Sequence, residues 1–441
     1  MAGIYVHIPF CQSRCAYCDF FSTTRVAERD AYVHALCREI EARRDEQTGE
    51  GKASETSIGT IYFGGGTPST LSSEQIGRIL DCICSNYHVD PDAEVTLEMN
   101  PDDCSFSTPP LTSPAWAGAC RGSEDSLSSG GHEGGSLPAV FHPEGGAGRR
   151  AVNRVSLGIQ TFDDDLLRLI RRRHDARGAV EAVRRLQGLG INNISIDLIY
   201  GLPGQTLEQW QRDLDIAFSL GIQHLSAYSL SYEHGTALSR WREEGRISEA
   251  PDDLSVAMYE RLCQQAREAG FEHYEISNFA LAGFRSRHNS SYWCGSPYLG
   301  CGPGAHSFDG QRIRRANSPD LDLYLRLWSG ASEASQMPCQ SVAPGKAGRS
   351  GCSGGTDQSV TVEILSDAEL YDEAVMCGLR TSLGVSLDDI SQRFGRESLD
   401  YLLRMARPHI QASRLVAADG RLRLSEKALM ISDDIMSDLM A

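Results

Sequence analysis

Short apolar runs rich in β-branched residues recur along the chain, separated by longer segments with helical periodicity. Such runs predict buried β-strands, and apolar positions spaced three or four residues apart predict amphipathic helices. The expected strands are GIYVHI (3–8), TIYFGG (60–65), EVTLEMN (94–100), VNRVSLGIQ (152–160), NISIDLIYG (193–201) and HLSAYSL (224–230). Strands that alternate with helices in this way predict a parallel α/β sheet or barrel.

Two of the intervening helices carry clear start signals. Ser72 with Gln75, and Thr206 with Gln209, match the Ser/Thr-x-x-Gln pattern of a capping box. Gly221 is expected to end the second of these helices. Both helices end just before a new strand, so the chain reads as a series of βα units. Right-handed crossovers between such units place the carboxyl ends of the strands, with their loops, on one shared face.

Composition divides the chain into a large domain and a small one. Residues 1–328 form the expected core domain, interrupted by a Gly-, Ser- and Pro-rich insertion at 104–150. Residues 329–358 have a similar composition and are expected to be a linker. Residues 359–441 predict amphipathic helices followed by a hairpin that turns at Asp419-Gly420, which indicates a small winged-helix-like domain.

The charge balance excludes some partners. The 441 residues include 42 Lys and Arg against 59 Asp and Glu, a formal net charge of -17, which repels nucleic acid and anionic lipid. No stretch approaches the roughly 20 apolar residues of a membrane span, and the chain begins without a secretory signal pattern. We therefore expect a cytoplasmic protein whose scattered cysteines are mostly packed thiols.

The segment CQSRCAYCDF places three cysteines, Cys11, Cys15 and Cys18, directly after the first expected strand. A structural zinc site usually takes a fourth Cys or His nearby, whereas an iron–sulfur cluster can be held by three thiolates. Such a cluster keeps one iron without a protein ligand, and a small chelating molecule can bind there. The spacing therefore favours a cluster with an open iron over a closed zinc site.

Other candidate site residues also lie at strand ends. FGGGTPSTL follows the second strand, and its glycines allow a ligand to approach the backbone closely. Glu98 and Gln160 close two further strands, and Asp197 lies between apolar neighbours in a third. A carboxylate in such a strand must be paired or face a polar cavity. Because strand ends share one face, these residues predict a ligand site there.

With these motifs together, the chain resembles the radical S-adenosylmethionine (SAM) superfamily. The resemblance implies a partial (β/α)6 barrel in which Cys11, Cys15 and Cys18 hold a [4Fe–4S] cluster whose open iron binds SAM. Reduction of that cluster by an electron donor would cleave SAM. Carried over motif by motif, the resemblance places the following residues at the SAM site: Tyr5, Tyr17, Gly65, Gly66, Thr67, Glu98, Gln160, Arg172, Asp197, Ser229 and His306.

YVHIPFC, SLGIQTF, IDLIYGLPGQT and AYSL further resemble the branch that contains the HemW-type haem chaperones and the oxygen-independent coproporphyrinogen III dehydrogenases. The dehydrogenase pattern has another cysteine two residues beyond the third, where this chain has Phe20. The motif HNSSYW instead resembles the haem-binding motif of the chaperones, with His288, Tyr292 and Trp293 as its haem residues. Imidazole is a common axial ligand of haem iron, and aromatic rings can pack on a porphyrin.

The resemblance therefore implies a haem chaperone that binds a [4Fe–4S] cluster, SAM and haem, and delivers haem to respiratory haem proteins. It implies no coproporphyrinogen dehydrogenase activity, and it allows a homodimer. The alternative is the dehydrogenase itself, which converts propionate side chains to vinyl groups by means of a 5'-deoxyadenosyl radical. Porphyrin turnover under anaerobic reducing conditions separates the two hypotheses.

Overall fold

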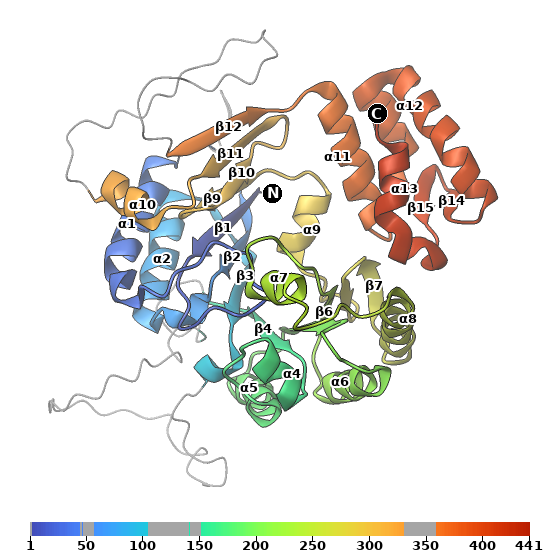
Figure 1. Cartoon of the computed structure of the whole chain (residues 1–441). Helices are drawn as coiled ribbons and strands as arrows, with labels where there is room; N and C mark the ends of the chain where they lie inside the picture. Colours follow the sequence, from blue (N-terminus) through green and yellow to red (C-terminus); the bar gives the residue numbers. More distant parts are fainter. Residues whose placement is uncertain (1, 45, 47–56, 105–140, 142–150, 330–358) are drawn as a thin grey trace, which may run out of the picture.

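The computed structural model describes residues 2–44, 46, 57–104, 141, 151–329 and 359–441 (Figure 1). At its centre six parallel strands lie side by side in chain order. They are β1 (Ala2–Ile8), β2 (Ile58–Gly65), β3 (Val89–Met99), β4 (Arg154–Gln160), β5 (Ile194–Tyr200) and β6 (His224–Ser229). Every expected strand is present, with ends that differ by a few residues.

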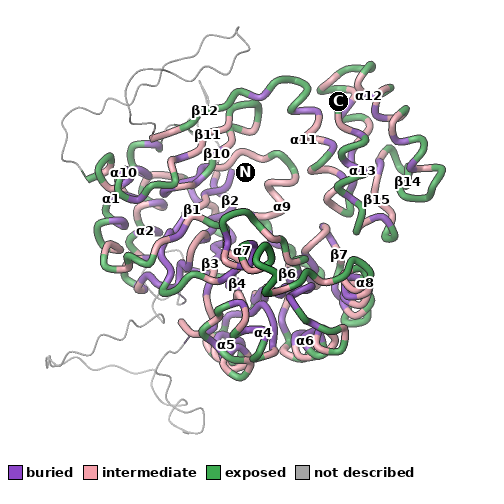
Figure 2. Tube along the Cα trace, viewed as in Figure 1, coloured by how far each residue is buried: buried purple, intermediate pink, exposed green. Residues whose placement is uncertain are grey.

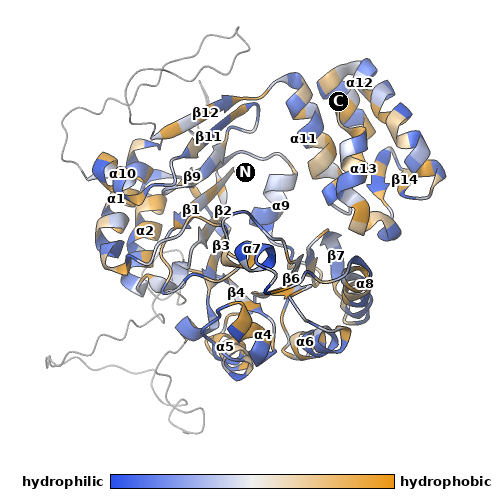
Figure 3. Cartoon of the chain, viewed as in Figure 1, coloured by the Kyte–Doolittle hydropathy of each residue, from blue (hydrophilic) through white to orange (hydrophobic). Residues whose placement is uncertain are grey.

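Helices cover the outer side of these strands (Figure 1). They are α1 (Arg29–Ala42), α2 (Ser73–Asn86), α5 (Ala176–Gly188), α6 (Leu207–Ser219) and α8 (Asp252–Glu268). Two shorter helices, α4 (Asp164–Leu169) and α7 (Ala237–Glu243), pack against the segment after β1, where Leu166 and Leu238 lie in one cluster with Ala16. Both predicted capping boxes form, at Ser72 with Gln75 and at Thr206 with Gln209. Gly221 follows α6 with a φ of 66°, a conformation that suits glycine. In Figure 3 apolar and polar residues alternate along these helices.

Successive residues of a strand point to opposite sides of the sheet, and this alternation decides what lines the barrel. In β4 the odd positions Val155 and Leu157 belong to the apolar core shared with the helices. The even positions Arg154 and Ser156 therefore face the inside of the barrel. In Figure 2 the strands are mostly buried, whereas the outer helices expose one side to solvent.

The parallel strands are extended at both edges by short strands that the sequence did not predict. They are β7 (Glu272–Glu275), β8 (Asn278–Ala280), β9 (Tyr298–Cys301), β10 (His306–Phe308), β11 (Ile313–Asn317) and β12 (Val360–Ile364). β9 pairs in parallel with β1, and the other pairings are antiparallel. Runs of three to five residues are too short to show a period. Two helices, α9 (Arg287–Trp293) and α10 (Leu321–Trp328), flank β9 to β11.

The C-terminal region packs around a core of its own. It contains α11 (Asp367–Arg380), α12 (Leu387–Gln411), α13 (Ser432–Leu439), β13 (Val385–Ser386), β14 (Leu415–Ala418) and β15 (Arg421–Leu424). The predicted hairpin joins β14 to β15, and Asp419 and Gly420 both have positive φ, of 54° and 69°. That backbone is typical of a type I′ turn.

The insertion expected at 104–150 and the linker expected at 329–358 lie almost wholly outside the described residues. Cys104, Phe141 and Ser329 are the described exceptions, and the first two are buried. The domain boundaries therefore stay predictions. Among the described helices, none is long and apolar enough to cross a membrane.

Candidate functional site

The three cysteines of the segment after β1 lie at the mouth of the barrel. Cys11 is buried and accepts a hydrogen bond from Thr67 Oγ1 at 3.4 Å, and Arg172 Nη1 lies 3.3 Å from the Cys15 sulfur. Burial, with a smaller contribution from the charge of Cys15, raises the pKa of Cys11 and raises that of Cys18 to about 11. The three thiols therefore lie within reach of one another's charge.

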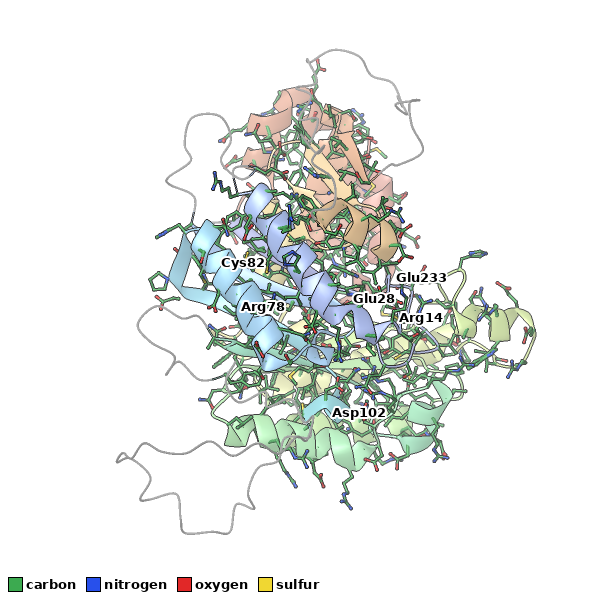
Figure 4. The ribbon with its side chains drawn as sticks, turned by 90° about the vertical axis from the view of Figure 1, so that its left-hand side faces the viewer. Arg14, Glu28, Arg78, Cys82, Asp102 and Glu233 are labelled. Carbon is green, nitrogen blue, oxygen red and sulfur yellow. The ribbon has the colours of Figure 1, made fainter. Side chains whose placement is uncertain are left out.

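The segment is tied to the loops of other strands. Ala16 donates its N–H to the Ile170 carbonyl at 3.0 Å and accepts a hydrogen bond from the N–H of Leu238 at 2.9 Å. In Figure 4, Arg14 of this segment and Glu233 of the loop after β6 are labelled on the same side of the molecule. The loops that follow the first and sixth strands thus meet at the mouth.

Across the described residues, no three His, Cys, Asp or Glu side chains converge as the ligands of one metal ion would. A [4Fe–4S] cluster does not need that convergence, because each thiolate binds a different iron. The donor set of Cys11, Cys15 and Cys18, with the cationic Arg172 beside one sulfur, suits thiolate ligation of such a cluster. It does not suit a single zinc ion.

The glycines after β2 lie directly against this segment. A side chain at Gly66 would meet Pro9 and the carbonyl oxygens of Ile8 and Phe10 at 2.9 to 3.0 Å. One at Gly65 would meet the His7 ring at 2.7 Å, and Gly65 also has a φ of 108°. These glycines therefore allow a close approach to the end of β1 and the segment that follows it, and the expected approach of a ligand stays a prediction.

Glu98 lies on the inward side of β3. Its Oε1 accepts a hydrogen bond from Tyr62 Oη at 2.7 Å, and the Gly65 N–H also donates to it. Burial, and secondarily the charge of Asp197, raise the pKa of Glu98 to about 7 against the opposing hydrogen bonds. This carboxyl group therefore titrates near neutral pH.

Asp197 and Gln160 stand on the next strands. Asp197 accepts a hydrogen bond from Ser156 Oγ at 3.1 Å and another from Ser226, and burial raises its pKa. Gln160 is buried at the end of β4 with a φ of 73°, in the left-handed region that glutamine rarely adopts. Such strain is common at ligand sites.

Arg172 connects the cluster segment to β3 and β4. Its Nη2 donates to Asn100 Oδ1 at 2.6 Å and to the Gly158 carbonyl oxygen, while Nη1 faces Cys15. Tyr17 is half-buried beside it, and burial raises the pKa of its hydroxyl. The structure thus brings Tyr17, Arg172 and the thiols together, as the resemblance implies.

A cavity of about 560 Å³ opens beside the cluster segment. Its walls include Tyr5, His7, Phe20, Tyr292, Tyr298 and His306. Two expected SAM residues, Tyr5 and His306, therefore share one cavity with a residue of the expected haem motif. Phe20, which stands where the dehydrogenase pattern has a cysteine, leaves 62% of its surface exposed at this cavity.

Ser229 lies elsewhere. It is exposed and lines a second cavity of about 360 Å³ between the loop after β6 and Met430 and Ile431 of the C-terminal region.

His288 is buried among the strands. Its ring nitrogens bond to Thr60 Oγ1 at 2.7 Å and to Tyr292 Oη at 2.8 Å, and the ring stacks on Tyr62 at 5.0 Å between centroids. Burial, and secondarily the charge of Arg154, lower the pKa of His288 to about 3, so its imidazole is neutral. Neutral imidazole is the form that ligates iron, but here Tyr292 occupies one nitrogen.

Trp293 does not join the cavity. Its ring packs under the guanidinium of Arg380 on α11, with 4.7 Å to the ring centroid. Tyr292 and Trp293 are consecutive residues of α9, but Tyr292 lines the cavity and Trp293 contacts α11. Of the expected haem residues, the structure brings only His288 and Tyr292 together.

Sequence reasoning missed several residues of the site. Tyr62 holds Glu98, and Asn100 joins Arg172 to Thr67. His7 lies between Tyr5 Oη at 3.2 Å and the Phe21 carbonyl at 2.9 Å. The alternation of side chains along a strand could have predicted two of these residues. His7 lies on the same side of β1 as Tyr5, and Tyr62 lies on the same side of β2 as Gly64.

Comparison with known proteins decides the family. The model of the radical SAM superfamily matches residues 144–217, and that of the HemN C-terminal domain matches residues 365–431. The haem chaperone HemW of Lactococcus lactis is 31% identical over 88% of this chain and 84% of its own length. The chain belongs to the HemW family of the radical SAM superfamily. A second relative supports this assignment: HemW of Bacillus subtilis is 32% identical over 98% of this chain and 95% of its own length.

Among solved structures, the coproporphyrinogen III oxidase HemN of Escherichia coli superposes with a TM-score of 0.71. It is 19% identical, and the match covers 100% of this chain and 90% of that one. At this identity the likeness shows the fold alone. It confirms the predicted radical SAM barrel.

We predict that SAM binding depends on pH, because Glu98 has a pKa of about 7 and is one of the residues expected at the SAM site. Above about pH 7 the carboxylate is ionised and attracts the fixed positive charge of the SAM sulfonium, whereas below it the group is neutral. We expect the affinity for SAM to rise several-fold between about pH 6 and about pH 8. Isothermal titration calorimetry across this range checks the expectation. A Glu98→Gln variant should show a flat profile, and an unchanged slope in that variant would assign the titration to another group.

Proposed function

We propose that this protein is a haem chaperone that holds a [4Fe–4S] cluster on Cys11, Cys15 and Cys18, binds SAM beside it, and carries haem. The observation that carries the proposal is the shared cavity, whose walls include Tyr5 and His306 of the expected SAM site together with Tyr292 of the expected haem motif. When bound, the cluster supplies an open iron for SAM. Its neighbour Arg172 offers a guanidinium fork suited to a carboxylate.

The dehydrogenase alternative has less support. The cavity wall carries the phenyl ring of Phe20 at the position of the dehydrogenase cysteine. Anaerobic incubation with coproporphyrinogen, SAM and a reductant is expected to give no decarboxylated product. Accumulation of vinyl-bearing porphyrin would make the protein an enzyme of porphyrin biosynthesis instead.

Delivery of haem needs a protein acceptor, and we propose a respiratory haem protein, together with an electron donor that reduces the cluster. The cytoplasmic location and the homodimer remain predictions. Every described cysteine is a free thiol, which is compatible with a reducing compartment.

His288 is the proposed axial ligand, and its hydrogen bond to Tyr292 sets the conditions for ligation. Haem iron can reach the Nε2 atom only after the Tyr292 hydroxyl has left it. In an anaerobic spectroscopic titration with haem, we expect His288→Ala to bind at least tenfold more weakly than the parent. Tyr292→Phe keeps the ring, removes the competing hydroxyl, and should bind a few-fold more tightly because no hydrogen bond worth about 1 kcal/mol has to be broken.

The pair of variants makes this titration specific. Haem stacked nonspecifically on the cavity aromatics would respond to neither change in the expected direction. Saturable binding that is indifferent to His288 would remove that residue from the haem site.

A further inference from the structure

Arg154 is a buried cation on the inward side of β4. Only 1% of its surface is exposed, and its neighbour across the sheet is Thr96 of β3. Two residues further along the same side, Ser156 bonds to Asp197 of the SAM site. Arg154 therefore lies within the barrel, one step deeper than the residues at the mouth.

Within the described part of the chain, Arg154 makes neither a hydrogen bond nor an ion pair, and its Nε is enclosed without a partner. The neighbouring Thr96 Oγ1 is unpartnered as well. A buried guanidinium without a hydrogen-bond acceptor is costly, because its N–H groups have lost water and gained no hydrogen bond in exchange. Two adjacent unsatisfied donors of this kind indicate that an acceptor belongs between them.

Arg43, another deeply buried arginine of the described residues, has hydrogen-bond partners. Arg43 is fully buried, but it bonds to Glu39 at 2.8 Å, to Glu46 at 2.8 Å and to the Gly300 carbonyl at 2.7 Å. Arg43, which has a structural role, is thus paired with carboxylates. Arg154 has no such partner among the described residues.

The acids on the inward side of the neighbouring strands β3 and β5 are engaged elsewhere. Glu98 accepts from Tyr62 and Asp197 accepts from Ser156. Glu94, also on the inward side of β3, accepts the backbone N–H groups of Arg287 and His288 at 3.0 Å. Among the described residues, no carboxylate is therefore hydrogen-bonded to Arg154, although the charge of Arg154 acts to lower the pKa values of Glu98, Asp197 and His288.

We infer that Arg154 binds a propionate carboxylate of the haem that this protein carries. The inference rests on the proposed function, and it assigns to haem a second anchor besides His288. A propionate is an apt ligand because guanidinium binds carboxylate through two parallel hydrogen bonds, and Thr96 Oγ1 can donate a third. For the SAM carboxylate we propose Arg172 as the partner instead, because it lies beside Cys15 of the cluster segment.

Haem dimethyl ester tests the inference, because it keeps the iron and the ring but blocks both carboxylates. In anaerobic titrations of the full-length protein, we expect the parent to prefer haem over the ester by about tenfold or more, as charge-assisted hydrogen bonds require. Arg154→Met should bind the two ligands equally. His288→Ala should weaken both ligands and keep the preference. Arg177→Met, on the exposed side of α5, is the matched control and should behave as the parent.

Failure of the inference differs from failure of the proposed function. A parent that binds haem and its ester equally, or an Arg154→Met variant that keeps the preference, overturns the role of Arg154 and leaves the chaperone function standing. A parent that binds neither ligand overturns both. Where Arg154→Met does not fold, Arg154→Lys carries the test, because it keeps the charge but loses the fork. A reduced preference in that variant supports the inference, and an undiminished one contradicts it.

Discussion

Replacing Cys15 by alanine is expected to leave the protein without a [4Fe–4S] cluster after anaerobic reconstitution. Only Cys11 and Cys18 would then remain as thiolate ligands, and two thiolates leave two irons of a cubane without protein ligands. The loss is expected to be complete rather than partial, because Arg172, which lies 3.3 Å from the Cys15 sulfur, is a cation and cannot take its place. Iron and sulfide analysis, together with visible absorbance, measures the loss of the cluster.

Cys263→Ala is the control for this experiment. Cys263 lies on α8, half-buried and packed against the core, so its removal costs a little packing and no ligand. We expect this variant to reconstitute as the parent does. A Cys15→Ala protein with the parent's iron and sulfide content would remove the cluster from this segment.

Replacing Glu39 by glutamine is expected to lower the free energy of unfolding by about 3 to 5 kcal/mol, the usual cost of breaking a buried ion pair from one side. The Glu39 carboxylate accepts hydrogen bonds from Arg43 Nη1 at 2.8 Å, from the Gly302 N–H at 2.8 Å and from Tyr324 Oη at 2.7 Å. The substitution leaves Arg43 charged and buried without its main partner. It also weakens the hydrogen bonds that connect α1 to α10 and to the turn after β9.

Urea denaturation followed by far-UV circular dichroism checks this prediction. The matched control is Arg25→Ala, which breaks an exposed ion pair with Asp322 and should change stability little, because exposed pairs are screened by water and salt. Equal effects of the two variants would show that the Glu39 network does not hold the sheet extension to α1.

The sequence contained enough information for the barrel and the mouth of the site. The strands and capping boxes follow from local patterns, and the rule that parallel strands end on one face brings Glu98, Gln160 and Asp197 to the same mouth. The contact between the glycine run and the cluster segment follows the same logic, because β1 and β2 are neighbours that end together. These predictions depend on interactions between residues close in sequence or on a general rule of topology.

Other features lay beyond such reasoning. HNSSYW reads as one motif, yet its helix α9 directs Tyr292 to the cavity and Trp293 to Arg380 of α11. The hydrogen bond at Nδ1 of His288 comes from Thr60, more than 200 residues earlier in the chain. The missing partner of Arg154 is a property of the whole barrel interior, and the run VNRVSLGIQ alone gives no sign of it.

By itself, the sequence determined the cysteine spacing, the βα order, the strand ends and the net charge, because each is set by residue identity and local periodicity. The tertiary structure alone decided which polar groups are satisfied. It placed Gly300 and Ser307 against Arg43, placed Thr60 against His288, and gave Arg154 no hydrogen-bond partner among the described residues. The physical reason is that desolvation and hydrogen-bond pairing depend on what the folded chain places around a group, and distant segments supply those neighbours.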